Sequence, residues 1–382
     1  MNAFEFRAPP RIVVQDGASE RLGALLADLG ARHALIVTDP FLSASGLIDA
    51  AVAGLEPAGI AVTVFDAVQA DPPEASILAA TEMARTGGVD AVVGLGGGSA
   101  MDTAKLAALL AASDQRLADI YGVDQARGPR LTLVQMPTTA GTGSEATPIS
   151  IVTTADGQKK GVVSDWLYPD LAILDATLTL GLPPRATAMT GIDAMVHAVE
   201  AYTTRLKKNA VSDALAVRAL GLLGQNIRRV VEDGSDLAAR RAMLEGSLMA
   251  GMAFANAPVA AVHALAYPLG GLFHVPHGLS NALVFAEVAA FNLPAADRLY
   301  GELAPVLPDD LTGRRRDGEG FVQAIGALVA QMPMEQCLSQ VGVTETDLDR
   351  LAEDAMKVTR LLVNNPREVT PTDARAIYRA LL

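Results

Sequence analysis

The chain has 382 residues, half of them hydrophobic and 19% charged, with a formal net charge of -13. This length and apolar fraction predict a large core and two domains. The acidic balance argues against a nucleic-acid surface, which needs basic patches. A single cysteine, Cys337, cannot form an intrachain disulfide, and the first residues lack a basic segment followed by an apolar run. We therefore expect a cytoplasmic protein with no signal peptide and no membrane span.

The first 180 residues alternate between β-branched runs and segments rich in alanine and leucine. Strands are expected at residues 34–39, 62–66, 90–94, 131–135, 149–154 and 171–174, and helices at 18–30, 44–55 and 74–86. Such alternation is typical of a parallel sheet with crossover helices. This half of the chain therefore predicts an α/β domain.

Asp39 ends the first of these expected strands. A carboxylate at this place can accept hydrogen bonds from a ribose 2′-hydroxyl and would repel a 2′-phosphate, which favours NAD over NADP. The alternative is an aspartate that caps a turn or helix beside Pro40.

A glycine-rich turn, residues 94–99 with the sequence GLGGGS, follows the strand expected at 90–94 and opens a helix. Glycines let a phosphate approach the backbone, and the free N–H groups of a helix amino terminus favour an anion. Gly97, Gly98 and Ser99 are therefore candidate phosphate contacts. The spacing departs from the standard dinucleotide fingerprint, and a tight turn without a ligand would also use these glycines.

A second turn, residues 137–145 with the sequence PTTAGTGSE, follows the next expected strand. Thr138, Thr139 and Thr142 offer hydroxyls at the end of a parallel strand, where a ribose or phosphate needs them. An ordinary hydroxyl-rich loop is the alternative. Two such turns at adjacent strand ends favour a bound nucleotide. Lys160, farther along, could reach a phosphate or ribose oxygen or could simply be solvated.

After Pro183 and Pro184 the alternation stops. Helical spacing appears at residues 186–204, 210–231, 237–253, 320–331, 346–358 and 372–381. A proline pair at this change predicts a domain boundary, with an α/β domain at 1–183 and a helical domain at 184–382.

Four of the chain's five histidines lie between His197 and His277, and Asp193 precedes the first by one helical turn. Residues four apart share a helix face, so Asp193 and His197 can hold one ion. Three imidazoles, with the others drawn from the segments around His263 and His274, plus one carboxylate suit Fe²⁺ or Zn²⁺. Taken singly, these residues would be a surface pair or buried core histidines. Together they favour a metal site.

These motifs, in this order, resemble the iron-containing (group III) alcohol dehydrogenases. The resemblance rests on residues 96–105, 137–145, 191–202 and 263–281 and extends to 364–367. It implies the dehydroquinate synthase-like fold of that family: an amino-terminal dinucleotide-binding α/β domain, an all-helical carboxyl-terminal metal-binding domain, and an active site in the cleft.

The resemblance also implies roles by position. The implied metal ligands are Asp193, His197, His263 and His277. The implied cofactor contacts are Gly97, Gly98, Ser99, Asp102, Thr138, Thr139, Thr142 and Lys160, with Asp39 as the ribose-binding acid. The implied activity is hydride transfer between an alcohol, or its aldehyde or ketone, and NAD, with Fe²⁺ or another divalent metal such as Zn²⁺. The family commonly forms dimers or larger assemblies.

Tyr267 departs from the family pattern. Many members carry a histidine four residues after the position of His263, where it is assigned to proton handling, and this chain has a tyrosine there. A phenol with a pKa of about 10 is a poor base at neutral pH. Tyr267 and His274 are therefore both candidate catalytic residues, and a partly exposed histidine without a role is the alternative for His274.

Other functions stay open at this point. A tyrosine at position 267 is also similar to the hydroxyacid–oxoacid transhydrogenase branch of the family. A lyase of the dehydroquinate synthase type would use NAD only transiently. The complete metal set argues against a maleylacetate reductase, and a non-enzymatic nucleotide sensor would not need it. Phe254, Val259 and Phe273 suggest a partly apolar substrate pocket.

Overall fold

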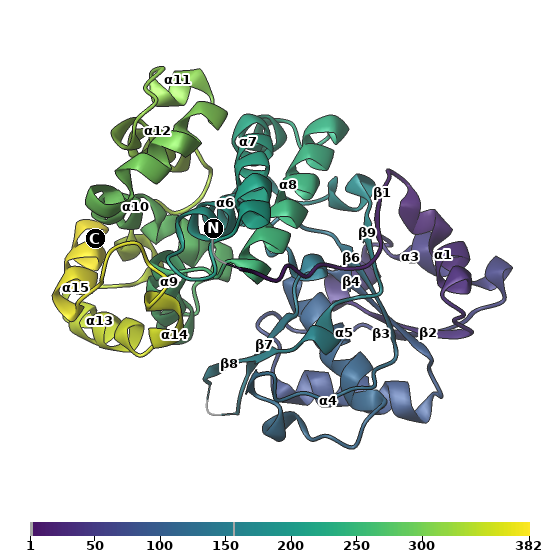
Figure 1. The fold of residues 1–382 in the computed structure, drawn as a ribbon. Coiled ribbons are helices and arrows are strands. Elements are labelled where there is room, and N and C mark those ends of the chain that lie inside the picture. Colours follow the sequence, from purple (N-terminus) through teal and green to yellow (C-terminus); the bar gives the residue numbers. More distant parts are fainter. Residues whose placement is uncertain (1–2, 156) are drawn as a thin grey trace. The chain divides into compact units, whose positions relative to one another are not determined.

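The computed structural model describes residues 3–155 and 157–382. The chain divides into two compact units (Figure 1): an α/β unit, Ala8–Gly181, and a helical unit, Leu182–Leu382 with the described residues before Ala8. The sequence placed that amino-terminal segment in the α/β domain. In the structure the Arg7 N–H donates to Asn256 Oδ1 at 2.8 Å, and Asn256 Nδ2 donates to the Arg7 carbonyl at 2.8 Å. These two bonds hold the segment on the helical unit.

A six-stranded parallel sheet forms the centre of the α/β unit, in the order β1-β9-β6-β4-β2-β3. Its strands are β1 (Ile12–Val14), β2 (His33–Val37), β3 (Ala61–Phe65), β4 (Ala91–Gly96), β6 (Thr132–Pro137) and β9 (Leu171–Leu174). The inner strands are buried almost throughout. Continuous apolar runs of this kind are what a sheet covered on both faces requires. The predicted architecture, an α/β domain followed by a helical one, is confirmed.

A smaller sheet contains β5 (Gly122–Val123), β7 (Ile149–Thr153) and β8 (Lys159–Val163). Strands β7 and β8 pair antiparallel. The strand expected at 149–154 therefore exists, but it belongs to this hairpin and not to the parallel sheet. Asp156 lies outside the described residues.

The helices of the α/β unit are α1 (Leu22–Asp28), α2 (Pro40–Ala44), α3 (Asp49–Ala53), α4 (Glu74–Thr86) and α5 (Gly98–Ala111). The helix expected at 44–55 is wrong in extent, because Gly46, with φ of 76°, separates α2 from α3. Helix α5 lies close against β4. A Cβ at Gly94 would stand 2.2 Å from Gln135 Oε1 and 3.0 Å from Met101 Cα, so only glycine permits this approach.

The helical unit contains α6 (Pro184–Thr203), α7 (Ala210–Glu232), α8 (Leu237–Asn256), α9 (Ala261–Phe273), α10 (His277–Leu303), α11 (Asp309–Thr312), α12 (Gly318–Ala330), α13 (Leu348–Met356), α14 (Thr359–Leu362) and α15 (Pro371–Ala380). Helices α9 and α10 were not predicted from the sequence. Both are strongly apolar and carry an internal proline, Pro268 and Pro294. An internal proline normally argues against a helix, because it removes one backbone hydrogen bond.

The stretch His277–Val306 is long and apolar enough to cross a membrane, contrary to the expectation from the sequence. However, 61% of its most apolar window is buried inside the protein. It contacts α6, α9 and α12, so it is a central helix of the helical unit.

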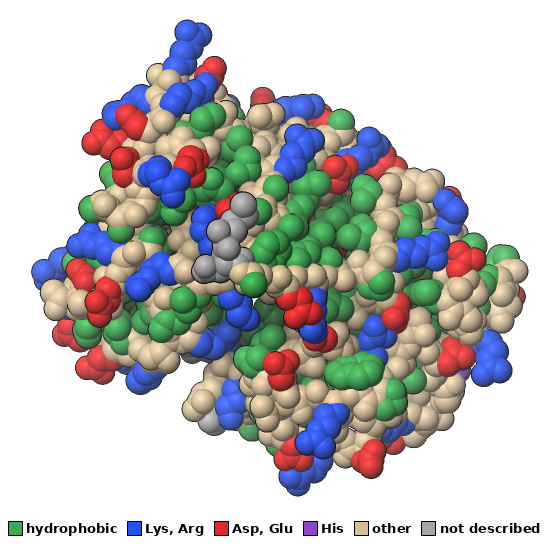
Figure 2. Space-filling model, viewed as in Figure 1, with side chains coloured by type: hydrophobic (Ala, Val, Ile, Leu, Met, Phe, Trp, Pro, Cys, Tyr) green, Lys and Arg blue, Asp and Glu red, His purple; other side chains and the backbone are tan. Residues whose placement is uncertain are grey.

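Figure 2 shows basic and acidic side chains interspersed over the region of α11 and α12. Arg228 pairs with Asp310 at 2.6 Å there, and Arg315 pairs with Glu319 at 2.6 Å. Exposed pairs contribute little stability each. This region is a solvated surface of mixed charge.

Candidate functional site

Three helices bring Asp193, His197, His263 and His277 together, and each side chain offers one ligand atom within 4.8 Å of all the others. Asp193 and His197 come from α6, His263 from α9, and His277 is the first residue of α10. Asp193 Oδ1 lies 3.9 Å from His197 Nε2 and 3.8 Å from His277 Nε2. The structure therefore gathers the four side chains that were predicted as metal ligands.

The cluster is buried except on one side. The side chains of Asp193, His197 and His263 are 2%, 5% and 4% exposed, whereas that of His277 is 34% exposed. The His197 ring stacks between His263, at 4.8 Å, and Phe254, at 4.4 Å. This packing fixes the imidazoles and leaves the His277 side accessible.

Glu200 orients one of these imidazoles. It lies on α6, and its Oε2 lies 2.6 Å from His263 Nδ1 while its Oε1 accepts the Val262 N–H at 2.6 Å. A carboxylate at Nδ1 holds the proton there and leaves the Nε2 lone pair for a ligand. Glu200 was not predicted from the sequence. The signal was a carboxylate on the same apolar helix, three residues after His197.

The ligand atoms of this cluster suit a divalent cation. Asn281 Nδ2 lies 2.5 Å from Asp193 Oδ1, 3.2 Å from His263 Nε2 and 3.3 Å from His277 Nε2, and its own Oδ1 is buried without a partner. An amide has two N–H hydrogens for these three acceptors. The excess of lone pairs, with nitrogen and oxygen mixed, is what a transition metal satisfies.

Asp193 carries the charge that such an ion needs. Burial alone would raise the pKa of Asp193, but the charges of His197, His277 and His263 and the Asn281 hydrogen bond lower it below its ordinary value. The carboxylate is therefore ionised at neutral pH inside the helical unit.

Tyr267 lies beside the cluster of ligand atoms, whereas His274 lies outside it. The Tyr267 ring is 6.2 Å from the His277 ring, and burial raises the pKa of Tyr267 although the charge and hydrogen bond of Arg360 lower it. His274 is exposed, ends α9 with φ of 55°, and is absent from the cluster of ligand atoms. The structure brings Tyr267 to the cluster but not His274.

In the α/β unit, the two predicted turns pack on each other. Gly97 caps α5, which begins at Gly98 directly after β4. A Cβ at Gly98 would stand 2.8 Å from Thr142 Cγ2, and one at Gly97 would stand 3.8 Å from Thr139 Oγ1. The space therefore requires glycine at position 98, whereas the distance at position 97 is an ordinary van der Waals contact. Thr138 is 4% exposed, so Thr139 and Thr142 are the threonines that reach the surface.

Asp39 and the glycine turn follow neighbouring strands. Strand β2 pairs with β3 on one side and with β4 on the other, so the chain reverses its winding between β2 and β4. Ligands of open α/β sheets bind beyond the carboxyl ends of strands at such a point. Asp39 Oδ1 accepts the Phe41 and Leu42 N–H groups at 2.9 and 3.0 Å, which is the capping role that the sequence left open. Its Oδ2 faces Gly96, so the cap does not occupy both oxygens.

Lys160 is exposed on β8, with its Nζ 5.3 Å from the centre of the Tyr121 ring. No hydrogen bond or ion pair among the described residues joins it to either turn. Its neighbour Lys159 pairs with Asp71 at 2.6 Å, and the Asp71 N–H donates to Ser99 Oγ at 3.2 Å. Of the two lysines, Lys159 is therefore the one that is linked to the glycine turn, through Asp71 and Ser99.

The two halves of the chain match models of one family. Residues 9–176 match the model described as iron-containing alcohol dehydrogenase, and residues 187–382 match the carboxyl-terminal model of the Fe-containing alcohol dehydrogenase family. The chain belongs to the iron-containing alcohol dehydrogenase family. Members are NAD-dependent, metal-containing alcohol oxidoreductases, so the predicted activity and the predicted NAD and metal cofactors are confirmed.

Several members of this family are similar over the whole chain. A long-chain-alcohol dehydrogenase of Geobacillus thermodenitrificans is 40% identical and covers 97% of this chain and 95% of its own length. The solved structure of a 1,3-propanediol oxidoreductase is 35% identical, with a TM-score of 0.95 over 100% of both chains. The NAD⁺ complex of sulfoacetaldehyde reductase from Bifidobacterium kashiwanohense is 29% identical, with a TM-score of 0.91 over 100% of this chain and 99% of the other.

Asp102 of this dehydrogenase, predicted as a cofactor contact, faces the protein interior. Its Oδ1 accepts the Ser144 hydroxyl at 2.6 Å, and its Oδ2 accepts the Ile151 N–H at 2.8 Å. These bonds tie α5 to the threonine turn and to β7. The carboxylate therefore holds the turns together.

A fully buried lysine, which the sequence analysis missed, stands beneath the same turns. Lys105 Nζ donates to Ser144 Oγ at 2.7 Å and to the Ile149 carbonyl at 2.7 Å. Burial lowers the pKa of Lys105 to about 8 and raises the pKa of Glu145 to about 7. Glu145 Oε1 is buried without a hydrogen bond in the described structure. Lys105 is recognisable in the sequence as a positive charge on an alanine- and leucine-rich helix.

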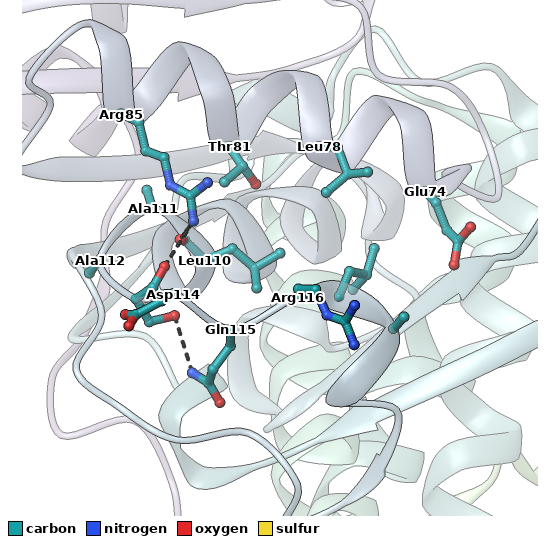
Figure 3. Close-up of a pocket in the computed structure, with 13 residues that line it drawn as sticks. Glu74, Leu78, Thr81, Arg85, Leu110, Ala111, Ala112, Asp114, Gln115 and Arg116 are labelled. Carbon is teal, nitrogen blue, oxygen red and sulfur yellow. Dashed lines mark hydrogen bonds between the residues drawn. The ribbon is translucent and has the colours of Figure 1, made fainter.

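A cavity of about 800 Å³ lies at the other end of α5 (Figure 3). Its lining comes from α4 and from the chain around Leu110–Ala118. Arg85 donates to the Leu110 and Ser113 carbonyls at 2.5 and 2.8 Å, which satisfies the carboxyl end of α5. Because α5 is about 20 Å long, this cavity is remote from the glycine turn.

Proposed function

We propose that Asp193, His197, His263 and His277 hold the divalent metal of this alcohol dehydrogenase. The observation that carries the proposal is the convergence of four ligand atoms within 4.8 Å, with more acceptors than Asn281 can satisfy. A divalent metal supplies a Lewis acid that lowers the pKa of an alcohol hydroxyl and polarises an aldehyde carbonyl. The family name favours Fe²⁺, and the same ligands suit Zn²⁺.

The residues around the ligands keep the site ready for the ion. Glu200 holds the proton of His263 on Nδ1, and Phe254 holds the His197 ring by stacking. The exposed side of His277 is the approach for a small alcohol or aldehyde. Phe254, Val259 and Phe273 supply apolar surface for its carbon chain.

NAD is proposed to bind at the first turn of α5, with Gly97, Gly98 and Ser99 against its phosphates. Thr138, Thr139, Thr142, Lys160 and Asp102 complete the proposed set, with Asp102 acting through Ser144. Nicotinamide carries the hydride. Asp39 Oδ2, beside the turn, suits a ribose hydroxyl and would repel a 2′-phosphate, which supports NAD over NADP.

The proton released on alcohol oxidation is proposed to leave through a ribose hydroxyl of the cofactor or through His274, which is exposed three residues before His277. Tyr267 is proposed to position the substrate by a hydrogen bond. The same tyrosine keeps a hydroxyacid–oxoacid transhydrogenase as the second candidate function. Turnover of both acids without added NAD would distinguish it.

Cytoplasmic location and a homodimeric assembly complete the proposal. The lone Cys337 supports a reducing compartment.

Metal removal tests the proposed function. Chelator-treated protein should lose NADH formation from alcohols and regain it with Fe²⁺ or Zn²⁺. Full activity in metal-free protein would refute the proposal. A panel of alcohols, diols and hydroxy acids on the reconstituted protein would then define the substrate.

A further inference from the structure

The open side of the metal cluster is flanked by Tyr267. His277 is the one ligand with a substantially exposed side chain, at 34%, and the Tyr267 ring lies beside it. A substrate that reaches the cluster past His277 therefore passes the Tyr267 side chain.

Arg360 stands next to that tyrosine. It lies on α14, which packs against α9, and its positive charge is close enough to the Tyr267 hydroxyl to lower the pKa of that phenol. Its backbone is also held in place, because Asn364 Nδ2 donates both to the Arg360 carbonyl at 3.1 Å and to the Val259 carbonyl at 2.9 Å. The charge is thus anchored to the segment that leads into α9.

No carboxylate among the described residues forms an ion pair with Arg360. Two acids near it in sequence have other partners: Asp354 pairs with Lys357 at 2.5 Å and Asp349 with Arg375 at 2.5 Å. A guanidinium has five N–H donors. Arg360 is exposed, so these donors can meet a ligand.

The acidic surroundings of Arg360 bear on what its positive charge can bind. The protein carries a net charge of -13, and Asp193 and Glu200 place two carboxylates close enough to influence Tyr267. Such surroundings repel anions. The bound metal would take the reacting hydroxyl, so an anionic head group at the other end of the substrate needs a further cation to bind at the open side, whereas a neutral head group does not.

We propose that Arg360 is a specificity residue that binds an anionic head group, carboxylate or sulfonate, on a hydroxy acid substrate. This inference rests on the proposed function. The far hydroxyl of the substrate is oxidised to the aldehyde, its hydride passes to NAD⁺ to give NADH, and one proton is released. A carboxylate or sulfonate can accept two parallel N–H bonds from the guanidinium, which a neutral hydroxyl cannot.

Matched substrates test the proposal on the metal-reconstituted enzyme with NAD⁺. One arm compares 4-hydroxybutanoate with butane-1,4-diol, and the other compares 2-hydroxyethanesulfonate with ethane-1,2-diol. We expect the wild-type protein to prefer an acid over its diol in at least one arm, which also distinguishes carboxylate from sulfonate. Arg360→Gln should lower the acid-to-diol ratio of kcat/KM by about 10- to 100-fold, mainly through KM. Arg360→Lys should retain part of the preference.

Lys357→Gln is the matched control, because it removes one exposed positive charge from the neighbouring turn. It should leave the ratio within twofold. Binding is measured separately by competitive inhibition of diol oxidation with butanoate and with ethanesulfonate, neither of which has a hydroxyl. The inhibition constant should rise about tenfold in Arg360→Gln.

An unchanged ratio in Arg360→Gln, or an equal effect in Lys357→Gln, would overturn the proposal for Arg360. So would a wild-type enzyme that prefers the diol in both arms. If wild-type protein shows no metal-dependent oxidation of any alcohol, it is the proposed function that fails. Diol oxidation without an Arg360-dependent acid preference refutes only this inference.

Discussion

The proposed metal site in the helical unit and the proposed nucleotide site at the glycine turn of the α/β unit are built in opposite ways. In the first, charged and polar side chains converge on one point with more acceptors than donors. In the second, side chains are removed at Gly97 and Gly98, and the polar groups nearby, Asp102 and Lys105, are bonded inward. Side-chain chemistry therefore characterises the proposed metal site, whereas backbone shape characterises the proposed nucleotide turn.

Loss of one ligand should have the largest effect if side-chain chemistry dominates the metal cluster. His263→Ala is expected to abolish stoichiometric metal and to lower kcat/KM on the order of 1,000-fold, because Lewis-acid stabilisation is lost. Metal per chain and NADH formation are the measurements. His33→Gln, a change at a histidine hydrogen-bonded to Thr63 in the α/β unit, is the control and should keep its metal. Full metal content in His263→Ala would contradict the claim that side-chain chemistry dominates the proposed metal site.

Glu200→Gln should weaken metal binding without removing a ligand. The neutral amide can still contact His263 Nδ1 but holds its proton less strongly, so affinity should fall about 10- to 100-fold. Competition with a chromophoric chelator measures it. Glu319→Gln, on the exposed face of α12, is the matched change and should have no effect. Equal metal affinities in the two variants would show that Glu200 does not support metal binding.

Gly98→Ala tests whether backbone shape controls the nucleotide turn. The new Cβ would stand 2.8 Å from Thr142 Cγ2, so we expect KM for NAD to rise about tenfold from overpacking. Thr142→Ser removes that methyl group and should partly restore KM in the double variant. Gly326→Ala meets nothing within 4 Å and serves as the control. A Gly98→Ala enzyme with unchanged KM would show that the turn tolerates a side chain.

Asp39→Asn separates the two roles of Asp39. Asparagine is as good a helix cap as aspartate, so α2 should persist while the negative charge is lost. We expect the NADP-to-NAD ratio of kcat/KM to rise several-fold, because the repulsion of a 2′-phosphate disappears. Asp39→Gly should give a similar ratio with lower thermal stability. An unchanged ratio in both variants would leave Asp39 with the capping role alone.

The buried charges beneath the turns, on Lys105 and Glu145, should affect the stability of the fold. Burial raises the pKa of Glu145 from 4.5 to about 7, so the folded state binds more protons between these values and stability should fall as pH rises through this window. The loss is up to about 3 kcal/mol. Lys105 acts in the other direction above pH 8, where its lowered pKa makes stability rise with pH.

Glu145→Gln should flatten the fall in melting temperature between pH 4.5 and 7. Glu82→Gln, on the exposed face of α4, should leave the profile unchanged. A wild-type profile that rises across the same window would contradict the assignment to Glu145.

The same contrast explains what the sequence could predict. Histidines are rare in this chain, so a cluster of Asp193 with three histidines and the α/β–helical division were predictable from residue type and alternation. The choice of His277 over His274 came from the family resemblance. Glu200 and Asn281 were not, because a single polar residue on an apolar helix does not reveal its partner. Helices α9 and α10 were missed because their apolar residues are continuous and each contains a proline. Asp102 faces Ser144, a contact that depends on the packing of α5 against the second turn and leaves no local pattern.

The central claim is tested most directly by anomalous diffraction from crystals of iron-loaded protein, collected on both sides of the iron absorption edge. The account predicts one peak per chain, bonded at about 2.0–2.3 Å to Asp193, His197, His263 and His277. A peak elsewhere, or well-ordered imidazoles that share no peak in iron-saturated protein, would contradict it.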